Sequence, residues 1–257
     1  MTKQTYTEIV NIILRDGDRC APRGKETHEL LNASIQFTPT VMIGRRGMSK
    51  RLAWLESLMM VGGVFDLDII AAVAPKANIE LYRHQSDYGP RIYQQLLAAH
   101  ATLSEDRLSR RAIIFLNDRD TPGEDCACTT SIQFLIRDDK LTSIVSMRSW
   151  DFVYGFPMDT VMFGFLTTMM GLSLGALSEK VIVNAGSLHI YDSTQHLAKE
   201  VSLPKKFYFT DVSLYNTNIE DISRYCRYGL NKFVDSGELP FNCTQEVVDA
   251  QQFQFSY

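Results

Sequence analysis

The sequence predicts an α+β fold in a single domain that spans residues 1–257. Segments with strand and helix patterns follow one another without the strict alternation of a doubly wound sheet. No internal repeat, low-complexity run or Pro/Gly/Ser-rich linker divides the chain. With 257 residues, 45% of them apolar, the chain is long enough to bury one large hydrophobic core.

Helical spacing of apolar residues predicts four helices, at about residues 5–15, 48–61, 89–103 and from Thr160 onward. The fourth lies in the most apolar stretch, residues 159–177. This stretch is interrupted by Thr and Gly and lacks the flanking aromatic and basic anchors of a membrane span. We therefore expect a buried central helix and no association with a membrane.

Runs of β-branched and aromatic residues between turn residues predict the strands. They are expected in residues 30–40, from residue 110, in 130–149, in 180–191 and in 205–215. The 130–149 segment reads as two strands joined by a turn at Asp138, Asp139 and Lys140.

Composition and charge exclude several classes of function. The net charge of −4 provides no basic field for nucleic acid or an anionic membrane. Five scattered cysteines are too few for a disulfide scaffold, which predicts free thiols in a reducing compartment. The N-terminus lacks the pattern of a signal peptide, so we expect a cytoplasmic protein.

Cys126 and Cys128 stand one residue apart in the stretch CACTTSIQF. Zinc needs four ligands, and no second Cys/His pair at a suitable spacing is visible, so no metal site is predicted. Redox pairs usually have two intervening residues. A nucleophilic thiolate activated by nearby arginines remains, and the structural alternative is a small buried apolar side chain.

Four further polar positions are candidates for binding. Arg110 and Arg111 after Ser109, and Arg148 before Ser149, could hold phosphate through guanidinium and hydroxyl donors, or they are surface charge at strand ends. Asp159 is either an N-cap of the long helix or a carboxylate that accepts from an amino group such as cytosine N4. His189 and Tyr191 share one side of a strand and could grip a sugar hydroxyl, although His189 could also be a core histidine.

The order of these motifs is more specific than any one of them. Across residues 109–191 the chain resembles the thymidylate synthase family, and weaker matches reach about residue 20. The matching motifs are SRR, Cys-x4-Gln-Phe, Arg-Ser-x-Asp, Gly-Phe-Pro-x-Asp and Gly-x-x-His-x-Tyr. Within the family, CTTSIQFLIRDDKL, MRSWDFVYGF and NAGSLHIY are most similar to the phage enzymes that hydroxymethylate deoxycytidylate (dCMP).

The resemblance implies a thymidylate synthase-like fold with a large mixed sheet flanked by helices, and a homodimer formed through that sheet. It also implies that the Cys128 thiolate adds to C6 of a pyrimidine nucleotide, whose C5 then takes a one-carbon unit from 5,10-methylenetetrahydrofolate. Cys126 would be a bystander. The partners would be a pyrimidine nucleoside monophosphate and a folate, in the cytoplasm, or in the host's cytoplasm if the chain is phage-encoded.

The resemblance also assigns roles to individual residues. Tyr88 and Asp159 would belong to the catalytic group with Cys128, and Asp151 would lie near the folate pterin. Arg110 and Arg111 would cross to the nucleotide site of the other subunit. The implied nucleotide-binding residues within one chain are Arg23, Gln133, Arg148, Ser149, Asp159, His189 and Tyr191.

Asp159 implies the choice of base. Uridylate enzymes of the family have Asn at this position, which can donate to O4 and accept from N3–H. An ionised Asp can only accept, which suits the N4 amino group of cytosine, and a protonated Asp can also donate to N3. A uracil base would leave a buried polar group unpaired, which is costly, so the interpretation is an enzyme that acts on cytidylate. The sequence does not decide whether the sugar is ribose or deoxyribose.

One position departs from the family pattern. The family has a glutamate three residues before a helix tryptophan, but Arg51 stands three residues before Trp54. Glu56 follows Trp54 by two residues, on a different helix face, and is not expected to substitute. Three explanations are open: Arg51 could pair with Asp159, it could hold a different cosubstrate, or the chain is out of register with the family at Trp54. A C5-methylating enzyme, or a nucleotide-binding protein whose transfer chemistry is altered or lost, therefore remains an alternative to hydroxymethyl transfer.

Overall fold

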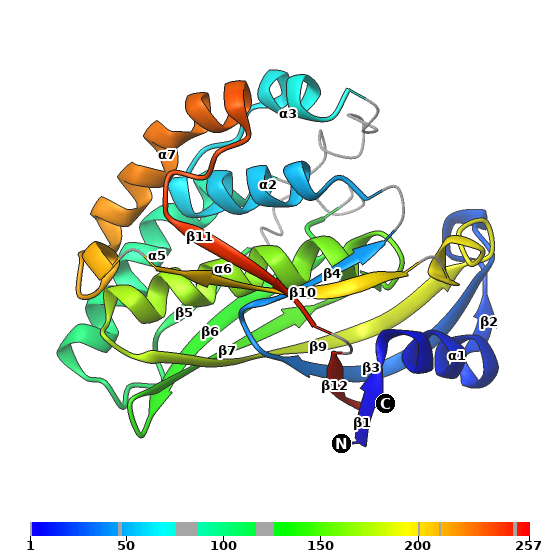
Figure 1. Cartoon of the computed structure of the whole chain (residues 1–257). Coiled ribbons are helices and arrows are strands. Elements are labelled where there is room, and N and C mark those ends of the chain that lie inside the picture. The colour runs from blue at the N-terminus through cyan, green and yellow to red at the C-terminus, as the bar shows by residue number, and fades with distance from the viewer. Residues whose placement is uncertain are drawn as a thin grey trace.

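A large mixed β-sheet runs through the computed structural model, which describes residues 2–45, 48–75, 87–116, 126–199, 201–210, 212–248 and 251–257 (Figure 1). Its strand order is β1-β12-β3-β9-β7-β6-β5, with β2 beside β3 and β8 beside β9. The strands are β1 (Thr2–Thr5), β2 (Asp18–Cys20), β3 (Thr27–Phe37), β5 (Ile113–Phe115), β6 (Thr129–Arg137), β7 (Lys140–Met147), β8 (Trp150–Asp151), β9 (Leu177–Tyr191) and β12 (Gln252–Ser256).

This sheet is mixed because β9 runs parallel to β7 and β8, while the other pairs are antiparallel. The predicted turn between β6 and β7 is confirmed. Asp138 and Asp139 have φ of 49° and 58°, as a two-residue hairpin turn that follows the twist of its strands requires. The predicted mixture of strands and helices without regular alternation is also confirmed.

A second, three-stranded sheet has the order β11-β10-β4. Six helices accompany the two sheets in the described residues. The strands are β4 (Val41–Arg45), β10 (Val201–Phe209) and β11 (Cys243–Val247), and the helices are α1 (Tyr6–Asp16), α2 (Lys50–Gly62), α3 (Leu67–Val73), α5 (Tyr88–Glu105), α6 (Gly155–Ser173) and α7 (Ile219–Ser236). The predicted strand in 205–215 ends at Phe209 and is followed by a short 3-10 helix, Val212–Leu214, while residue 211 lies outside the described part.

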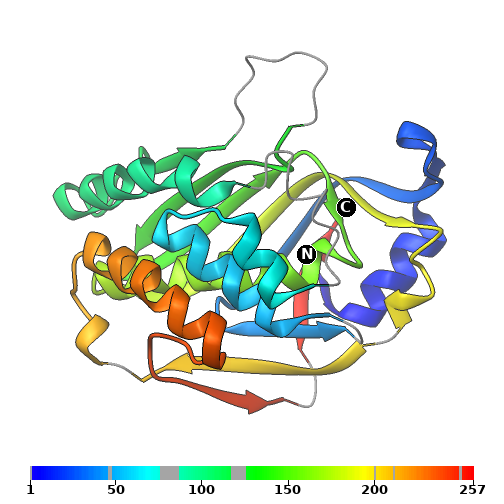
Figure 2. The ribbon, with the colours of Figure 1, turned by 90° about the horizontal axis from the view of Figure 1, so that it is seen from above.

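Helix α6 lies at the centre of the molecule. It packs on β7 and β9, α2 packs on α6, and α7 packs on α2, so the helices form successive layers above the sheet (Figures 1 and 2). Most of the side chains of α6 are buried, which confirms the predicted central helix. No helix among the described residues has the length and apolarity needed to cross a membrane. Gly164 permits the close approach of the turn before β4, since a Cβ there would stand 2.1 Å from the carbonyl oxygen of Pro39.

The start of α6 differs from the prediction. The helix begins at Gly155, five residues before Thr160, and its N-cap position is Tyr154, so the interpretation of Asp159 as an N-cap is wrong. Pro157 is tolerated because the first backbone N–H groups of a helix have no partner within it. The GFP stretch therefore opens the helix, and Asp159 lies on its second turn.

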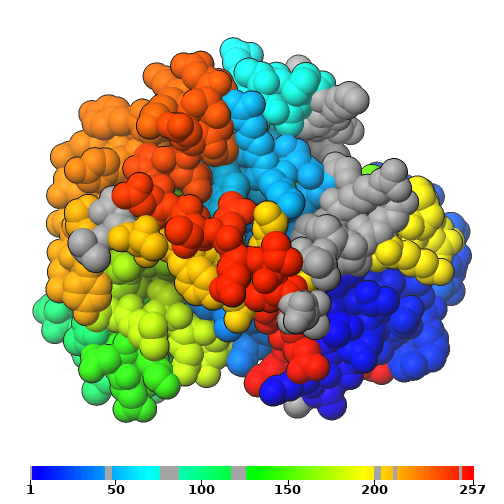
Figure 3. Space-filling view, viewed as in Figure 1, coloured from blue at the N-terminus to red at the C-terminus, as the bar shows by residue number. Residues whose placement is uncertain are grey.

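The two ends of the chain lie together, because β1 pairs with β12 in antiparallel register. On the face shown in Figure 3, the C-terminal residues in red lie between the dark blue residues near the N-terminus and the orange residues of α7. All five cysteines are within the described residues and are free thiols.

Candidate active site

Cys128 stands at the entrance to β6 and is half-buried. The segment before it is held by Arg148, which follows β7. The backbone N–H of Arg148 donates to the Cys128 carbonyl (2.8 Å), and its Nε donates to the carbonyls of Cys126 and Ala127 (3.2 Å each). One guanidinium therefore fixes the backbone on which the candidate nucleophile is carried, and places a positive charge beside it.

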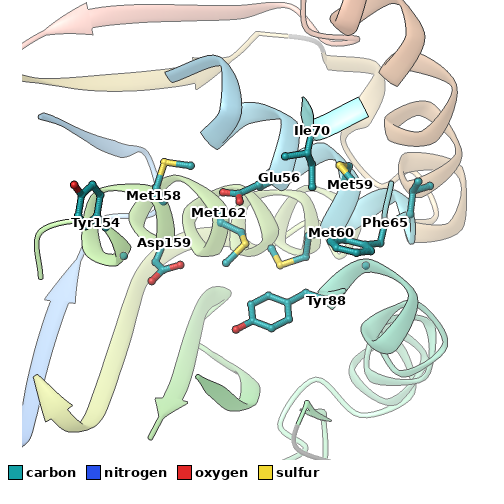
Figure 4. A pocket seen from close by; sticks show the side chains of 13 residues that line it. Glu56, Met59, Met60, Phe65, Ile70, Tyr88, Tyr154, Met158, Asp159 and Met162 are labelled. Carbon is teal, nitrogen blue, oxygen red and sulfur yellow. The ribbon is translucent and has the colours of Figure 1, made fainter. Parts of the chain in front are cut away.

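A cavity of about 250 Å³ opens between α2, the start of α5 and the start of α6. The carboxyl groups of Glu56 and Asp159 and the hydroxyl of Tyr88 point into it (Figure 4). The rest of its wall is largely apolar and contains four methionines. The lining residues are Glu56, Met59, Met60, Val64, Phe65, Ile70, Tyr88, Gly89, Tyr154, Gly155, Met158, Asp159 and Met162.

Asp159 is a carboxyl group whose ionisation is shifted to neutral pH. Burial raises its pKa to about 7, and the negative charges of Glu56 and Asp151 act in the same direction. A hydrogen bond from Trp150 Nε1 to Asp159 Oδ2 (2.8 Å) opposes the shift. Both protonation states are therefore accessible near pH 7, so this group can accept a hydrogen bond or donate one.

Tyr88 connects this cavity to the cysteine. The backbone N–H of Thr129 donates to its hydroxyl oxygen (3.4 Å), and Thr129 directly follows Cys128. Burial raises the pKa of the Tyr88 phenol well above its usual range, with smaller contributions from the charges of Asp159 and Cys128. The phenol is therefore neutral and keeps its proton for donation.

The second helix corrects the interpretation of Arg51 and Glu56. The guanidinium of Arg51 does not pair with Asp159, because its Nη2 donates to the carbonyls of Phe233 (3.2 Å) and Val234 at the C-terminal end of α7. Glu56 lies about 140° further round the helix and faces the cavity. The placement of Glu56 on a helix face away from the site is therefore wrong, since Glu56 lines the cavity together with Asp159.

Trp54 explains this error. It packs among Phe165, Phe207 and Phe209, with ring centroids 5.0 to 6.3 Å apart. The tryptophan therefore faces the core, and the cavity face of α2 carries Glu56 with Met59 and Met60, at the i+3 and i+4 spacing of one helix side.

A second cavity, of about 220 Å³, brings together five of the residues predicted to bind nucleotide: Arg23, Arg148, Ser149, His189 and Tyr191. Its remaining lining residues are Pro22, Thr27, Glu29 and Ser187. Two guanidinium groups in one small cavity offer the kind of donors that bind a dianionic group such as phosphate. The charges of Arg23 and Arg148 both act on Tyr191, lowering its pKa against the larger effect of burial.

His189 is a neutral imidazole in this cavity, because burial lowers its pKa. Its ring stands edge-on to that of Tyr191, with centroids 4.9 Å apart and planes at 78°. The charge of Cys128 acts on Tyr191 here and on Tyr88 in the first cavity. Cys128 itself lines neither cavity, but the backbone N–H of the next residue, Thr129, contacts Tyr88 of the first cavity, and the Cys128 carbonyl contacts Arg148 of the second.

Six predicted residues line neither cavity of their own chain: Arg51, Arg110, Arg111, Cys128, Gln133 and Asp151. Arg110 and Arg111 are exposed at the start of β5, and Gln133 Nε2 donates to the Arg110 carbonyl (2.8 Å). Asp151 Oδ1 accepts from the backbone N–H groups of residues 153 (2.7 Å) and 154 (3.1 Å), which orders the turn before α6. The proposed contact of Gln133 with nucleotide rests on the resemblance alone.

Sequence reasoning missed Glu29 and Ser187 in the second cavity. A signal for Ser187 was present, because it lies two residues before His189 and strand alternation puts both on one face. Glu29 is paired with His189 across β3 and β9, and only the register of those strands reveals this. Among the described residues, no group of three or more His, Cys, Asp or Glu is arranged to hold a metal ion.

The pKa of Asp159 has a consequence for stability. The ordinary value for this carboxyl is 3.8, and the folded protein raises it to about 7. Between these values the folded state holds a proton that the unfolded chain has lost. The contribution of Asp159 to stability is therefore full below about pH 4 and is lost as the pH rises through about 7.

We expect Asp159→Asn to remove this dependence, since the amide oxygen can still accept from Trp150 and cannot ionise. Relative to the wild type, the free energy of unfolding of the variant rises by about 2 to 4 kcal/mol at pH 8 and by much less at pH 4. Urea unfolding of both proteins at these two pH values measures the difference. A difference independent of pH would contradict the shifted pKa.

The class of protein follows from comparison with known families. The sequence model of the thymidylate synthase family matches residues 53–232, and the chain belongs to this family. The predicted resemblance is thus confirmed. Its fold, a large mixed sheet covered by helices, is consistent with this membership.

Three relatives give finer comparisons. The deoxycytidylate 5-hydroxymethyltransferases of Enterobacteria phages T4 and T2 are 31% and 33% identical to the chain over 218 residues, which cover 74% of this chain and 87% of each phage protein. A deoxyuridylate hydroxymethyltransferase of Bacillus phage SP01 is 24% identical over 216 residues, which cover 73% of this chain and 56% of that protein.

Proposed function

We propose that this protein is a pyrimidine nucleotide C5 hydroxymethyltransferase. It would transfer a one-carbon unit from 5,10-methylenetetrahydrofolate to cytidine or deoxycytidine monophosphate, through a covalent bond between Cys128 and C6 of the base. The observation that carries the proposal is that the backbone around Cys128 contacts both cavities, one with two guanidinium groups and one with a carboxyl group whose pKa is raised to about 7.

The second cavity supports binding of the nucleotide's phosphate and sugar. Arg23, Arg148 and Ser149 offer donors to the phosphate, and His189 and Tyr191 offer polar groups to a sugar hydroxyl. With the nucleotide held at both ends, the base extends toward Cys128. Positioning of this kind is a large part of the rate gain of a two-substrate reaction.

The base is read by Asp159. A protonated carboxyl can donate to N3 of cytosine and accept from its N4 amino group, and the pKa of about 7 makes this form available. Tyr88 and Glu56 lie in the same cavity and can move protons at the base. Both deoxycytidylate relatives are consistent with this choice of base, whereas the Bacillus phage relative acts on deoxyuridylate.

The first cavity has the surface that a folate requires. When bound, the folate supplies the one-carbon unit. Five of the cavity's lining side chains offer polarisable, adaptable contacts for a flat heterocycle: Met59, Met60, Phe65, Met158 and Met162. Both tryptophans of the chain are buried in the core and cannot stack on a bound folate. The methionines would contact its ring instead. Asp151 is kept as the candidate contact to the pterin.

A homodimer is part of the proposal. On the face of the large sheet opposite its buried residues, Leu135, Ile144 and Ile182 are half-buried, and the last two are neighbours across β7 and β9. These three apolar side chains share the face with the polar side chains of Gln133, Thr142 and Lys180, and a partner subunit would cover them together. Arg110 and Arg111, exposed in their own chain, would then reach the phosphate site of the other subunit.

Mass spectrometry of CMP, dCMP and dUMP incubated with the protein and methylenetetrahydrofolate tests the reaction. A cytidylate product heavier by CH2O is expected. Formation of dihydrofolate, followed by absorbance, would instead show methyl transfer. No product from any nucleotide, with nucleotide binding retained, would favour a binding protein whose transfer chemistry is lost.

Asp159→Asn tests the choice of base in the same assay. Since an amide can donate to O4 and accept from N3–H, the variant is expected to shift the preference from cytidylate toward uridylate by a factor on the order of 10². The ratio of kcat/KM for dCMP to that for dUMP measures the shift. An unchanged ratio would mean that Asp159 does not read the base.

A further inference from the structure

Glu29, Ser187 and His189 form a hydrogen-bonded chain along the wall of the second cavity. Ser187 Oγ lies 2.5 Å from Glu29 Oε1 and 3.4 Å from His189 Nδ1. Strand register explains the arrangement, because Glu29 pairs with His189 across β3 and β9, and Ser187 is two residues before His189 on the same face.

The directions of these hydrogen bonds are determined by the carboxylate. An ionised carboxylate can only accept, so the single hydroxyl proton of Ser187 is donated to Glu29. The second carboxylate oxygen, Oε2, accepts from the Cys20 thiol (3.6 Å). Burial and the charge of Glu29 raise the pKa of this thiol, so it keeps the proton that it donates.

The Ser187 oxygen can then only accept from the histidine. A neutral imidazole carries one N–H, and burial keeps His189 neutral. The N–H must therefore be at Nδ1, which leaves Nε2 with a lone pair. The opposite arrangement, with a protonated Glu29, would reverse every hydrogen bond of the chain and put the proton on Nε2.

We propose that Glu29 and Ser187 are positioning residues that hold His189 in its Nδ1–H form, so that Nε2 accepts a hydrogen bond from a sugar hydroxyl of the nucleotide. The sugar part of this inference rests on the proposed function. The tautomer itself is a property of the protein alone. The site is then selective for a ligand group that donates a hydrogen, and an ether or hydrogen at that sugar position is rejected.

Nitrogen NMR of the full-length protein labelled in its histidines tests the tautomer directly. In neutral imidazole the protonated nitrogen resonates far upfield of the other, and its couplings to the ring protons identify it. The His189→Gln variant assigns the signal among the five histidines. At pH 7.5 and without nucleotide, His189 is expected to be protonated at Nδ1, the minor form of free histidine.

Ser187→Ala removes the hydroxyl acceptor, and Ser187→Thr is the matched control that keeps a hydroxyl. The backbone of residue 187, which also hydrogen-bonds the imidazole, is present in both variants. In the alanine variant we expect part of the His189 proton population to move to Nε2, while the signals of His28 and His100 stay unchanged and report an intact fold. The threonine variant is expected to retain Nδ1–H. A wild-type His189 protonated at Nε2, or a tautomer unaffected by Ser187→Ala, would overturn the proposal.

Ligand binding tests the second half separately. Addition of dCMP is expected to shift the Nε2 resonance upfield, as an accepted hydrogen bond does, and Ser187→Ala should raise KM for the nucleotide about fivefold with kcat nearly unchanged. If His189 is protonated at Nδ1 but its Nε2 resonance does not shift when dCMP binds, the proposed hydrogen bond between Nε2 and the sugar hydroxyl is overturned. Failure of the hydroxymethyl reaction would leave the tautomer result standing, so the two failures are distinguishable.

Discussion

The Cys128→Ser variant is expected to bind nucleotide but to lose turnover by a factor on the order of 10⁴ or more. A serine hydroxyl is a far weaker nucleophile than a thiolate, and the positive charge of Arg148 beside this position favours an anion there. Release of tritium from dCMP labelled at C5 measures the first step, because addition to C6 makes that hydrogen exchangeable.

Cys126→Ser is the matched control, two residues away and also half-buried. Its backbone carbonyl, rather than its thiol, receives the hydrogen bond from Arg148, and serine preserves that carbonyl. We expect tritium release and turnover within about twofold of the wild type. Equal losses in the two variants would mean that the pair acts as a unit and that Cys128 alone is not the nucleophile.

Glu56→Gln is expected to lower kcat by a factor on the order of 10² with little change in KM for the nucleotide. The carboxylate shares a cavity with Asp159 and Tyr88, and the amide keeps its shape but cannot exchange a proton. Because the charge of Glu56 also raises the pKa of Asp159, the variant should shift the pH profile of kcat/KM to lower pH. Steady-state kinetics between pH 5 and 9 record both effects.

Arg51→Met is the control on the same helix, since it removes the guanidinium that stands where the family has glutamate. Its donors serve the last carbonyls of α7, so the expected result is a loss of about 1 kcal/mol in the free energy of unfolding and normal activity. If Arg51→Met lost activity and Glu56→Gln kept it, the roles assigned to the two positions would be reversed.

The second cavity, where the nucleotide is proposed to bind, could be predicted from the sequence because most of its predicted residues lie in short motifs within regular strands and turns. Arg148 and Ser149 are adjacent in the turn that follows β7. His189 and Tyr191 are two residues apart in β9, so strand alternation puts this pair on one side. Arg23 joins them from a distant segment, and the structure places it in the same cavity.

The α2 side of the first cavity, where the folate is proposed to bind, could not be predicted in this way, since it depends on how α2 is rotated about its axis. The buried residues of α2 lie all around the helix. Its apolar pattern therefore does not indicate which side faces the cavity. Taking Trp54 as the reference residue put Arg51 at the site. The aromatic cluster around Trp54 shows that this side faces the core.

The sequence by itself determined the α+β class, the order of the motifs and the identity of the candidate nucleophile, because these depend on local pattern and on spacing along the chain. Tertiary structure alone decided that Glu56 joins Asp159 and Tyr88 in one cavity and that Glu29 and Ser187 lie beside His189. Glu56, Asp159 and Tyr88 come from three helices, and Glu29 and His189 from two strands. Contacts between distant elements are set by helix rotation and strand register, which side-chain packing in the core selects.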